Sequence, residues 1–301
     1  MPREAPGPQG EIKRIRWPTE HHPYTGQSAV LATKHAKLPL IAPPLACALG
    51  LDVDAVDVDT DTLGTFSGEI PRTGSALETA VRKARLGMKA AGRELGLANE
   101  GSIGPDPAMP LLTVDREIVV LVDDNAGIVI WDAYATYDIV AATTSARPGE
   151  DLRQFITDAD FPAHLLIVRP NSGPVYPIRK GIDSRASLKS AIAEAAAVAT
   201  DGRARIETDL RAHACPSRQL VIARAAERLA QRAAARCPGC AAPGWGPVDV
   251  LMGVPCSWCG TDVEQPRAEI YGCPACDRQE IRPLVPPEAT GDPGICPACN
   301  P

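Results

Sequence analysis

The sequence predicts an α/β protein, with a mixed central sheet flanked by helices and a small C-terminal zinc-ribbon module. Strand-like and helix-like patterns alternate between residues 26 and 235, with three strand-like runs in succession near the middle. After residue 236 this periodicity disappears, and glycine, proline and cysteine dominate. The predicted organisation is a mobile N-terminal tail (1–25), an α/β domain (26–235) and a two-zinc module (236–301).

Composition and charge exclude several classes of protein. No run approaches 18 apolar residues, so we expect no membrane-spanning helix. The N-terminal stretch is rich in charge, proline and glycine, so we do not expect it to be a secretory signal. Without export, the ten cysteines are expected in a reducing, cytoplasmic environment, where they indicate metal binding rather than disulfides. A net charge of −6 argues against a nucleic-acid binder of the ordinary basic kind.

The first half begins with two strands and a short helix. Residues 28–33 (SAVLAT) read as a buried first strand. A short helix is expected to begin at Pro43-Pro44 and to end at Gly50. Residues 51–59 alternate apolar residues with aspartates, which is typical of a strand with acidic residues at its exit.

A longer helix and further strands follow. Ser75 and Glu78 have the spacing of a capping box, and apolar residues recur on one face as far as Gly92. Residues 94–105 (ELGLANEGSIGP) are expected to form a short strand that ends at Asn99-Glu100, followed by a glycine-bearing loop. The other elements predicted for this domain are strands at 117–124, 127–134, 137–144, 164–170, 173–181 and 204–209, and helices at 148–156, 187–200 and 216–235.

Four C-x-x-C knuckles carry the most specific chemical signal. Two residues between cysteines let one tight turn aim both thiolates at one tetrahedral metal, so four knuckles predict two structural zinc ions. A closed shell of four thiolates leaves no open coordination position, so these metals serve folding. Residues 256–276 alone resemble a zinc ribbon, which favours pairing the second knuckle with the third and the first with the fourth; sequential pairing is the alternative. The predicted ligands are Cys237, Cys240, Cys256, Cys259, Cys273, Cys276, Cys296 and Cys299.

The zinc module is acidic. Residues 237–301 hold three arginines, no lysine and eight acidic residues, and such a surface repels a phosphate backbone. The preceding helix carries a stripe of arginines at four-residue spacing, namely Arg224, Arg228, Arg232 and Arg236. A solvated helix face, or docking against the acidic module, is preferred over nucleic-acid binding as the use of this stripe.

Residues 64–72 (GTFSGEIPR) indicate a site for an anion. Two glycines, hydroxyl groups and Arg72 suit an anionic ligand, and Glu69 suits a cation that accompanies it. A phosphate ester with Mg²⁺ or Mn²⁺ would satisfy both. Further carboxylates are available at Asp57, Asp59, Asp61, Glu78 and Glu100, and basic partners at Lys34, His35, Lys37, Lys83, Lys180, Arg211, His213 and Arg218.

These residues also have structural interpretations. Helix capping alone explains Glu78, and a solvated strand edge explains the aspartates of residues 57–61. Glu100 is less easily explained, because a carboxylate between a buried strand and a glycine loop seldom serves packing. His35 and His213 are each typical of surface or hydrogen-bonded core histidines. The sequence has no Ser-His-Asp order, Walker loop or G-x-G-x-x-G motif.

The sequence resembles known families at two levels. The segments LATKHAK, DTDTLGTFSGEIPR, SALETAVRKARLGM and TDLRAHACPSR, with the zinc-knuckle tail, resemble a bacterial family defined as a domain of unknown function, over residues 26–301. Residues 28–104 are also distantly similar to the inosine triphosphate pyrophosphatase and Maf group of nucleotide hydrolases. The motifs of this second resemblance are ATKHAK after the first strand, ETAVRKAR in the helix and LANEGSIG at a strand end.

The second resemblance implies a chemistry and a set of roles. It implies metal-dependent attack of water on a nucleoside triphosphate, which releases pyrophosphate and a monophosphate. Lys37 would contact the phosphates, and Glu78 and Glu100 would bind Mg²⁺, with Glu100 also orienting the water. The late segment with His213 and Arg218 resembles the phosphate and base contacts of that group.

The leading prediction is therefore a Mg²⁺- or Mn²⁺-dependent phosphohydrolase acting on a small-molecule nucleotide. Its catalytic residues would be Lys37, Glu78 and Glu100. Its magnesium ligands would be Asp61, Glu69, Glu78 and Glu100. The residues that would contact the substrate are Thr33, Lys34, His35, Thr65, Arg72, Lys83, Lys180, Arg211, His213 and Arg218. The group has a second acid where this chain has Asn99, and this favours an alternative, a nucleotide- or nucleic-acid-binding zinc-ribbon regulator without turnover. A third alternative is an interaction protein whose zinc module mediates docking, and a homodimer is compatible with all three.

Overall fold

The computed structural model describes residues 17–18, 20–34, 37–58 and 74–301. The described residues fall into two compact units. One comprises Tyr24–Val122 and Val129–Arg232; the other comprises Asp123–Ile128, Ala233–Pro301 and the described residues before Tyr24. Residues 1–16 of the predicted tail lie outside the described residues. The predicted site residues that also lie outside them are His35, Asp59, Asp61, Thr65, Glu69 and Arg72.

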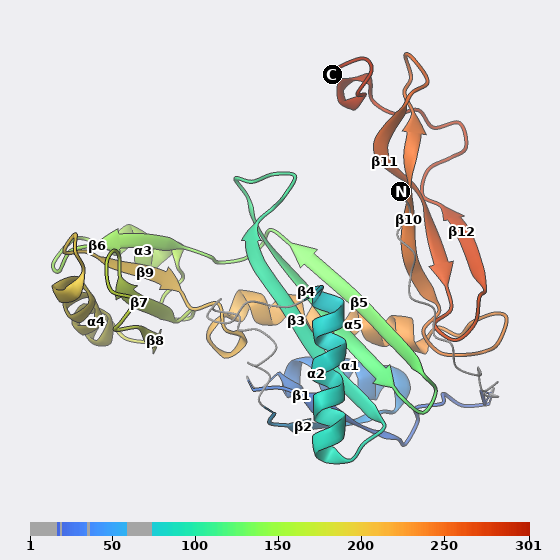
Figure 1. Cartoon of the computed structure of the whole chain (residues 1–301), viewed down its shortest axis with the longest axis horizontal. Coiled ribbons are helices and arrows are strands. Elements are labelled where there is room, and N and C mark those ends of the chain that lie inside the picture. The colour runs from blue at the N-terminus through green and yellow to red at the C-terminus, as the bar shows by residue number, and fades with distance from the viewer. Residues whose placement is uncertain (1–16, 19, 35–36, 59–73) are drawn as a thin grey trace. The chain divides into compact units, whose positions relative to one another are not determined.

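The first unit is built on a five-stranded sheet of order β2-β1-β3-β4-β5 (Figure 1). Its strands are β1 (Ser28–Ala32), β2 (Asp52–Val56), β3 (Leu95–Pro105), β4 (Thr113–Asp123) and β5 (Ile128–Thr136). β1 pairs in parallel with both β2 and β3. β3, β4 and β5 follow one another through short connections, so the sheet is mixed, as the sequence predicted.

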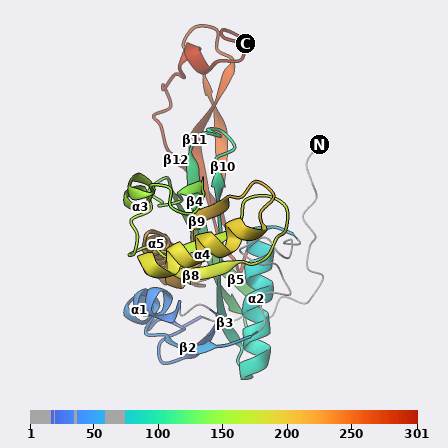
Figure 2. The ribbon, with the colours of Figure 1, turned by 90° about the vertical axis from the view of Figure 1, so that its left-hand side faces the viewer.

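Helices cover both faces of this sheet. α1 (Leu38–Leu49) and α2 (Ala76–Ala91) lie on opposite sides of it (Figure 2). The apolar stripe of α2 packs against alternate residues of β1, β3 and β4, and this forms a core of Val30, Ala80, Ala84, Met88, Ala98, Ile118, Val120 and Val122. A Cβ on Gly96 would lie 2.3 Å from the Met88 side chain, so the glycine permits this close helix–sheet approach.

The capping residues predicted some helix ends correctly and one helix start wrongly. Ser75 and Glu78 form the expected capping box at α2, and Gly50 ends α1 in the left-handed conformation, with φ of 65°. The predicted start of α1 was wrong, because the helix begins at Leu38 and contains Pro43 and Pro44. A proline-bearing turn is tolerated near a helix start, and here Pro39 occupies that place.

A second sheet in the same unit was not predicted as separate. It has four antiparallel strands in the order β6-β9-β7-β8, formed by β6 (Thr143–Ala146), β7 (Leu166–Pro170), β8 (Arg179–Ile182) and β9 (Ala204–Thr208). Helices α3 (Arg153–Asp158) and α4 (Arg185–Val198) pack on one face around Leu166, Val168, Leu188, Ile192 and Ile206. The run 137–144 therefore does not extend the meander: only its last two residues belong to a strand, and that strand pairs with β9.

The remaining elements are a long helix and the zinc module. α5 runs from Pro216 to Ala234, close to the predicted bounds. The module is a three-stranded antiparallel sheet of order β10-β11-β12, with β10 (Gly246–Pro255), β11 (Asp262–Gly272) and β12 (Gln279–Pro283). Among the described residues, no helix has the length and apolar character needed to cross a membrane.

Candidate functional site

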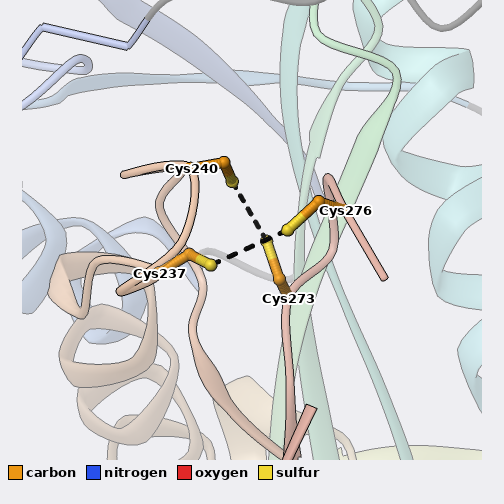
Figure 3. A group of neighbouring side chains, drawn as sticks. All are labelled: Cys237, Cys240, Cys273 and Cys276. Atoms are coloured by element: carbon orange, nitrogen blue, oxygen red, sulfur yellow. Dashed lines mark hydrogen bonds between the residues drawn. The ribbon is translucent and has the colours of Figure 1, made fainter. Parts of the chain in front are cut away.

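The eight knuckle cysteines form two groups of four. Cys237, Cys240, Cys273 and Cys276 make one group, whose side chains point toward a common centre (Figure 3), and Cys256, Cys259, Cys296 and Cys299 make the other. Between knuckles, the sulfurs of Cys237 and Cys276, Cys240 and Cys273, Cys256 and Cys299, and Cys259 and Cys296 are 3.6 to 3.9 Å apart. A tetrahedral zinc with Zn–S bonds of about 2.3 Å places its sulfurs about 3.8 Å apart. Both groups therefore have the ligand number, chemistry and spacing of a structural zinc site.

The pairing of the knuckles differs from both predicted schemes. The first knuckle joins the third and the second joins the fourth, rather than the nested or sequential arrangement. The reason is the β10–β11 hairpin, which pairs Gly246 with Gly272 at one end and Pro255 with Asp262 at the other. Strands of this length extend about 30 Å, so the second and third knuckles, which flank β11, cannot share one metal.

The structure also brings together a buried polar cluster in the α/β unit. Lys37 Nζ donates a hydrogen bond to Asn99 Oδ1 at 2.7 Å, and Asn99 Nδ2 donates to Glu117 Oε2 at 2.8 Å. Glu117 Oε1 in turn accepts from Arg218 Nε at 2.6 Å, and both side chains of this pair are almost fully buried. Residues from four separate segments thus converge in one hydrogen-bonded chain.

Strand register explains this convergence. Val30 and Leu31 of β1 pair with Gly96 and Leu97 of β3, so Asn99 lies just beyond the carboxyl end of β1. The chain leaves the sheet there and begins α1 after Lys37. Carboxyl ends of parallel strands are where α/β sheets bind ligands.

Glu100 points away from Asn99 because successive strand residues face opposite sides. Its carboxylate forms a salt bridge with Lys83 of α2, and only 6% of the Glu100 side chain and 14% of the Lys83 side chain are exposed. A charge buried to this degree is stable only when paired. The two predicted residues are therefore in contact, and Glu100 is already neutralised by a lysine.

The pKa values of Lys37, a member of the cluster, and of Asp115, a buried neighbour of Glu117 on β4, are both shifted. Burial, together with the nearby guanidinium of Arg218, lowers the pKa of Lys37 to about 8. Burial and the neighbouring Glu117 raise the pKa of Asp115 to about 7, although Arg218 acts in the opposite direction. Neither carboxylate oxygen of Asp115 has a hydrogen-bond partner among the described residues. A buried group of this kind is favoured in its neutral form.

The raised pKa of Asp115 predicts a pH-dependent stability. The unfolded chain ionises this carboxyl near pH 4, whereas the folded protein retains the proton to about pH 7. The contribution of Asp115 is therefore fully favourable below about pH 4, and the free energy of unfolding falls as pH rises to 7, by about 2–4 kcal/mol. Asp115→Asn should remove this fall, as measured by urea unfolding between pH 4 and 8. The exposed substitution Asp138→Asn is the control, and parallel curves for Asp115→Asn and the parent protein would contradict the assignment.

Glu78 caps helix α2, which is the structural alternative given by the sequence. Its Oε2 accepts hydrogen bonds from the backbone N–H of Ser75 at 2.8 Å and from the Ser75 hydroxyl at 3.1 Å. These bonds lower the pKa of Glu78. Glu78 also lines an open cavity of about 720 Å³ beside Arg82 and Trp131, whereas Glu100 is not among the lining residues of that cavity.

The other predicted substrate contacts are dispersed. Thr33 is half-buried at the end of β1, and its N–H donates to the Val56 carbonyl at 3.2 Å, while Lys34 is exposed. Arg211 forms a salt bridge with Asp209, with a shortest distance of 2.5 Å. His213 is exposed, and partial burial with Arg211 nearby lowers its pKa.

A second cavity adjoins the polar cluster. It has a volume of about 490 Å³ and is lined by Lys180 and Arg211, by Ile103 and Thr113 of the central sheet, and by Leu210. The Leu210 carbonyl accepts a hydrogen bond from Arg218 Nη1 at 2.8 Å, which links the cavity wall to the Glu117–Arg218 pair. Lys180, Arg211 and Arg218 thus lie in one region, and the volume suits a small ligand.

The four residues of the arginine stripe, three of which lie on α5, form ion pairs and hydrogen bonds within the protein. Arg228 forms a salt bridge with Asp132 at 2.8 Å, and Arg232 donates to the Trp131 carbonyl at 2.7 Å. Arg224 pairs with Glu227 on its own helix, and Arg236 donates to the Pro18 carbonyl. Arg228 and Arg232 therefore hold α5 to β5.

Sequence reasoning also missed a serine–histidine–aspartate contact. His164 lies between Asp160, at 3.1 Å from its Nδ1, and the Ser217 hydroxyl, at 2.9 Å from its Nε2. The Ser217 backbone N–H donates to the same Nε2, and the Ser217 hydroxyl accepts from the Val140 N–H. His164 thus satisfies an amide in the first turn of α5, which is a capping role.

Asp115 and Glu117 were missed although the sequence held a signal. They occupy alternate positions in β4, at the start of a run that is otherwise buried and apolar. Gly101 is a second signal, since a Cβ there would lie 2.1 Å from the Glu117 carboxylate. The glycine is the residue that leaves room for this buried acid.

Comparison with known proteins gives a family. No protein of curated function matches the chain. The model of the family described as "Domain of unknown function (DUF6671)" matches residues 83–301. The expected resemblance to a domain-of-unknown-function family is confirmed over that range, while the bacterial origin and the similarity to nucleotide hydrolases stay predictions. Because the match covers more than half of the sequence, the chain belongs to the DUF6671 family.

Proposed function

We propose that the α/β unit is a phosphohydrolase that releases pyrophosphate from a nucleoside triphosphate. The observation that carries the proposal is the hydrogen-bonded chain of Lys37, Asn99, Glu117 and Arg218 at the carboxyl end of β1, which Arg218 links to the wall of a cavity of about 490 Å³ through the Leu210 carbonyl. The Lys83–Glu100 salt bridge lies on the opposite face of the same strand end. Strand ends of this kind are the usual ligand sites of α/β sheets. The order of elements from β1 to β5, with the motifs of residues 28–104, is in keeping with a fold like that of the inosine triphosphate pyrophosphatases.

In this proposal Lys37 binds a phosphate oxygen. Its pKa of about 8 leaves it mostly charged at neutral pH, and binding an anion would stabilise the charge further. Lys180 and Arg211 of the cavity wall add positive charge on the substrate side. Such cations stabilise the charge that develops on phosphate oxygens in the transition state.

The hydrolytic step transfers the nucleotidyl group to water and gives a nucleoside monophosphate. A water oxygen forms a bond to the α-phosphorus, the bond from that phosphorus to the bridging oxygen breaks, and pyrophosphate leaves. In this proposal Glu100 orients the water and accepts its proton, which requires the reacting phosphate to reach around the strand end to the face of Glu100 and Lys83 to move from the carboxylate to the substrate. This exchange would couple substrate binding to exposure of the base.

Magnesium fits the described residues less well than zinc does. Apart from the two cysteine quartets, no group of three metal-ligating side chains is present among the residues that the structure describes. Glu78 is engaged in the helix cap and Glu100 in the Lys83 salt bridge. We therefore treat magnesium or manganese as a component of the metal–nucleotide substrate, since Mg²⁺ usually binds through substrate phosphates.

The assay is pyrophosphate release from a panel of nucleoside triphosphates with Mg²⁺ or Mn²⁺. Glu100→Gln should lower the rate by about a hundredfold or more, because it removes the general base. Glu94→Gln, an exposed glutamate just before β3, is the matched control and should retain the parent rate. Zinc content and melting temperature verify folding. Full activity of Glu100→Gln, or no product from the parent protein with any nucleotide, would refute the proposal.

One observation favours a second function, nucleotide binding without turnover. Asn99 is an amide and supplies no carboxylate, and it hydrogen-bonds to Lys37, Glu117 and the Ile118 carbonyl. A regulator of this kind would show a ligand-induced rise in melting temperature but no product. The same panel, read by thermal unfolding, separates the two functions.

We also propose that both cysteine groups hold zinc and that the metals serve folding. Four thiolates complete the tetrahedral shell and leave no position for substrate or water. The knuckle sulfurs accept backbone hydrogen bonds, for example from Gly239 to Cys237 and from Ala275 to Cys273 at 3.3–3.4 Å, which stabilise thiolates.

A further inference from the structure

One end of the zinc module exposes large apolar side chains. We call residues 253–266 and 284–301, which surround the cluster of Cys256, Cys259, Cys296 and Cys299, the Trp258 end. Trp258 is 79% exposed and Ile295 is 56% exposed. Each adjoins a ligand in sequence, and the sulfurs of Cys259 and Cys296 are 3.6 Å apart, so the two apolar residues belong to one small surface.

These side chains do not hold the module together. The core at this end consists of Val254, Cys256, Val263 and Cys296, with Val285, Ala289 and Cys299 packed against it. At the opposite end of the hairpin the corresponding tryptophan, Trp245, is buried and packs 6.2 Å from the ring of Tyr271. Trp258 differs from Trp245 in having no such packing role, although an exposed tryptophan costs hydrophobic free energy.

The backbone beneath Trp258 is fixed. Its N–H donates to Cys256 Sγ at 3.4 Å, and the Gly260 N–H donates to the Cys256 carbonyl at 3.0 Å. The neighbouring Ser257 N–H donates to the Gly291 carbonyl at 3.1 Å, which ties the knuckle to the C-terminal segment. An aromatic residue held on a rigid turn loses little conformational entropy on binding.

The charge of this end has a single sign. Residues 253–266 and 284–301 contain four acidic residues and no lysine, arginine or histidine. All four acids are exposed, and they are Asp262, Glu264, Glu288 and Asp292. A zinc ion bound by four thiolates adds a net charge of about −2. The surface therefore combines an aromatic anchor with four acidic side chains and no basic residue within these two segments.

We propose that the Trp258 end is a docking site for an arginine- or lysine-rich segment of a partner protein. A guanidinium can lie on the indole face while its neighbours pair with the surrounding carboxylates. Aliphatic side chains of the same segment would cover Ile295. Nucleic acid and acidic peptides carry the wrong charge for this surface. The inference does not depend on the proposed hydrolase activity, which concerns the other unit.

The test uses the full-length, zinc-loaded protein and a fluorescein-labelled peptide of alternating arginine and leucine, with binding followed by fluorescence anisotropy. The parent protein should bind saturably, and the affinity should fall as salt rises from about 50 to about 300 mM. Trp258→Ala should weaken binding by about tenfold or more, and Trp258→Phe by less, because indole is the best cation–π partner. Ile281→Ala, on β12 and 60% exposed, is the matched control and should change the affinity less than about twofold.

Zinc content separates a binding defect from misfolding. Two zinc ions per chain in Trp258→Ala would show that the cluster is intact. Should that variant lose zinc, the double substitution Asp262→Asn/Glu264→Gln tests the charge alone and should also weaken binding. The proposal is overturned if the parent protein does not bind the peptide. It is also overturned if Trp258→Ala binds as tightly as the parent, or if a glutamate–leucine peptide or a single-stranded oligonucleotide binds equally well.

Discussion

The double variant Cys237→Ser/Cys273→Ser is expected to retain one zinc ion per chain. Both cysteines belong to the same group of four, so the group of Cys256 and Cys296 keeps all its ligands. The nested and sequential pairings would each place these two cysteines in different sites and predict the loss of both ions. Zinc released by a thiol-modifying reagent, or measured by atomic absorption, gives the number directly.

Two further variants complete this test. Cys237→Ser/Cys256→Ser removes one ligand from each group and should lose both ions, and the exposed Cys47→Ser should keep both. Binding of structural zinc contributes about 10–16 kcal/mol in isolated zinc domains, so loss of a site should unfold its end of the β10–β11 hairpin. Loss of both ions in Cys237→Ser/Cys273→Ser would show that the observed pairing is wrong.

The pairing shows where sequence reasoning reaches its limit in this protein. The C-x-x-C spacing is local, and one tight turn fixes both thiolates, so the number and identity of the ligands follow from sequence. Which knuckles meet depends on the length and register of β10 and β11. Their sequences alternate poorly, with a proline at position 266 and register shifts near Leu251 and Met252, so the long hairpin is hard to recognise.

In the polar cluster, too, the sequence pointed to some of the residues and missed others. Lys37, Glu100 and Arg218 stood out because each adjoins a predicted strand end or helix start, and the structure places each in or beside the cluster. Asp115 and Glu117 did not stand out, because acids at alternate strand positions usually face solvent. Glu117 is buried together with Arg218, which α5 brings to that face from about a hundred residues later in the chain. Contacts of such long range leave no local pattern in the sequence.

Arg218→Met is expected to lower the free energy of unfolding by about 3–5 kcal/mol. The side chains of Arg218 and Glu117 are 3% and 0% exposed, and removing one partner of a buried ion pair leaves the other charge uncompensated. The Leu210 carbonyl also loses its donor. Urea unfolding at neutral pH measures the change. Arg224→Met is the matched control: its pair with Glu227 is exposed, so it should cost less than about 1 kcal/mol.

A double substitution tests whether the stability lost in Arg218→Met comes from the Glu117 carboxylate that is left buried without its arginine. In Arg218→Met/Glu117→Met both charges are replaced by apolar groups of similar length, and buried ion pairs replaced in this way often lose little stability or gain some. We expect the double variant to recover most of the stability lost in Arg218→Met, so that the two effects are strongly non-additive. If Arg218→Met lowered the free energy of unfolding no more than Arg224→Met does, the result would contradict the burial of the Arg218–Glu117 pair in this structure. If the double variant were less stable than either single variant, the cluster would be held by Asn99 and Lys37 acting through Glu117 rather than by the pair itself.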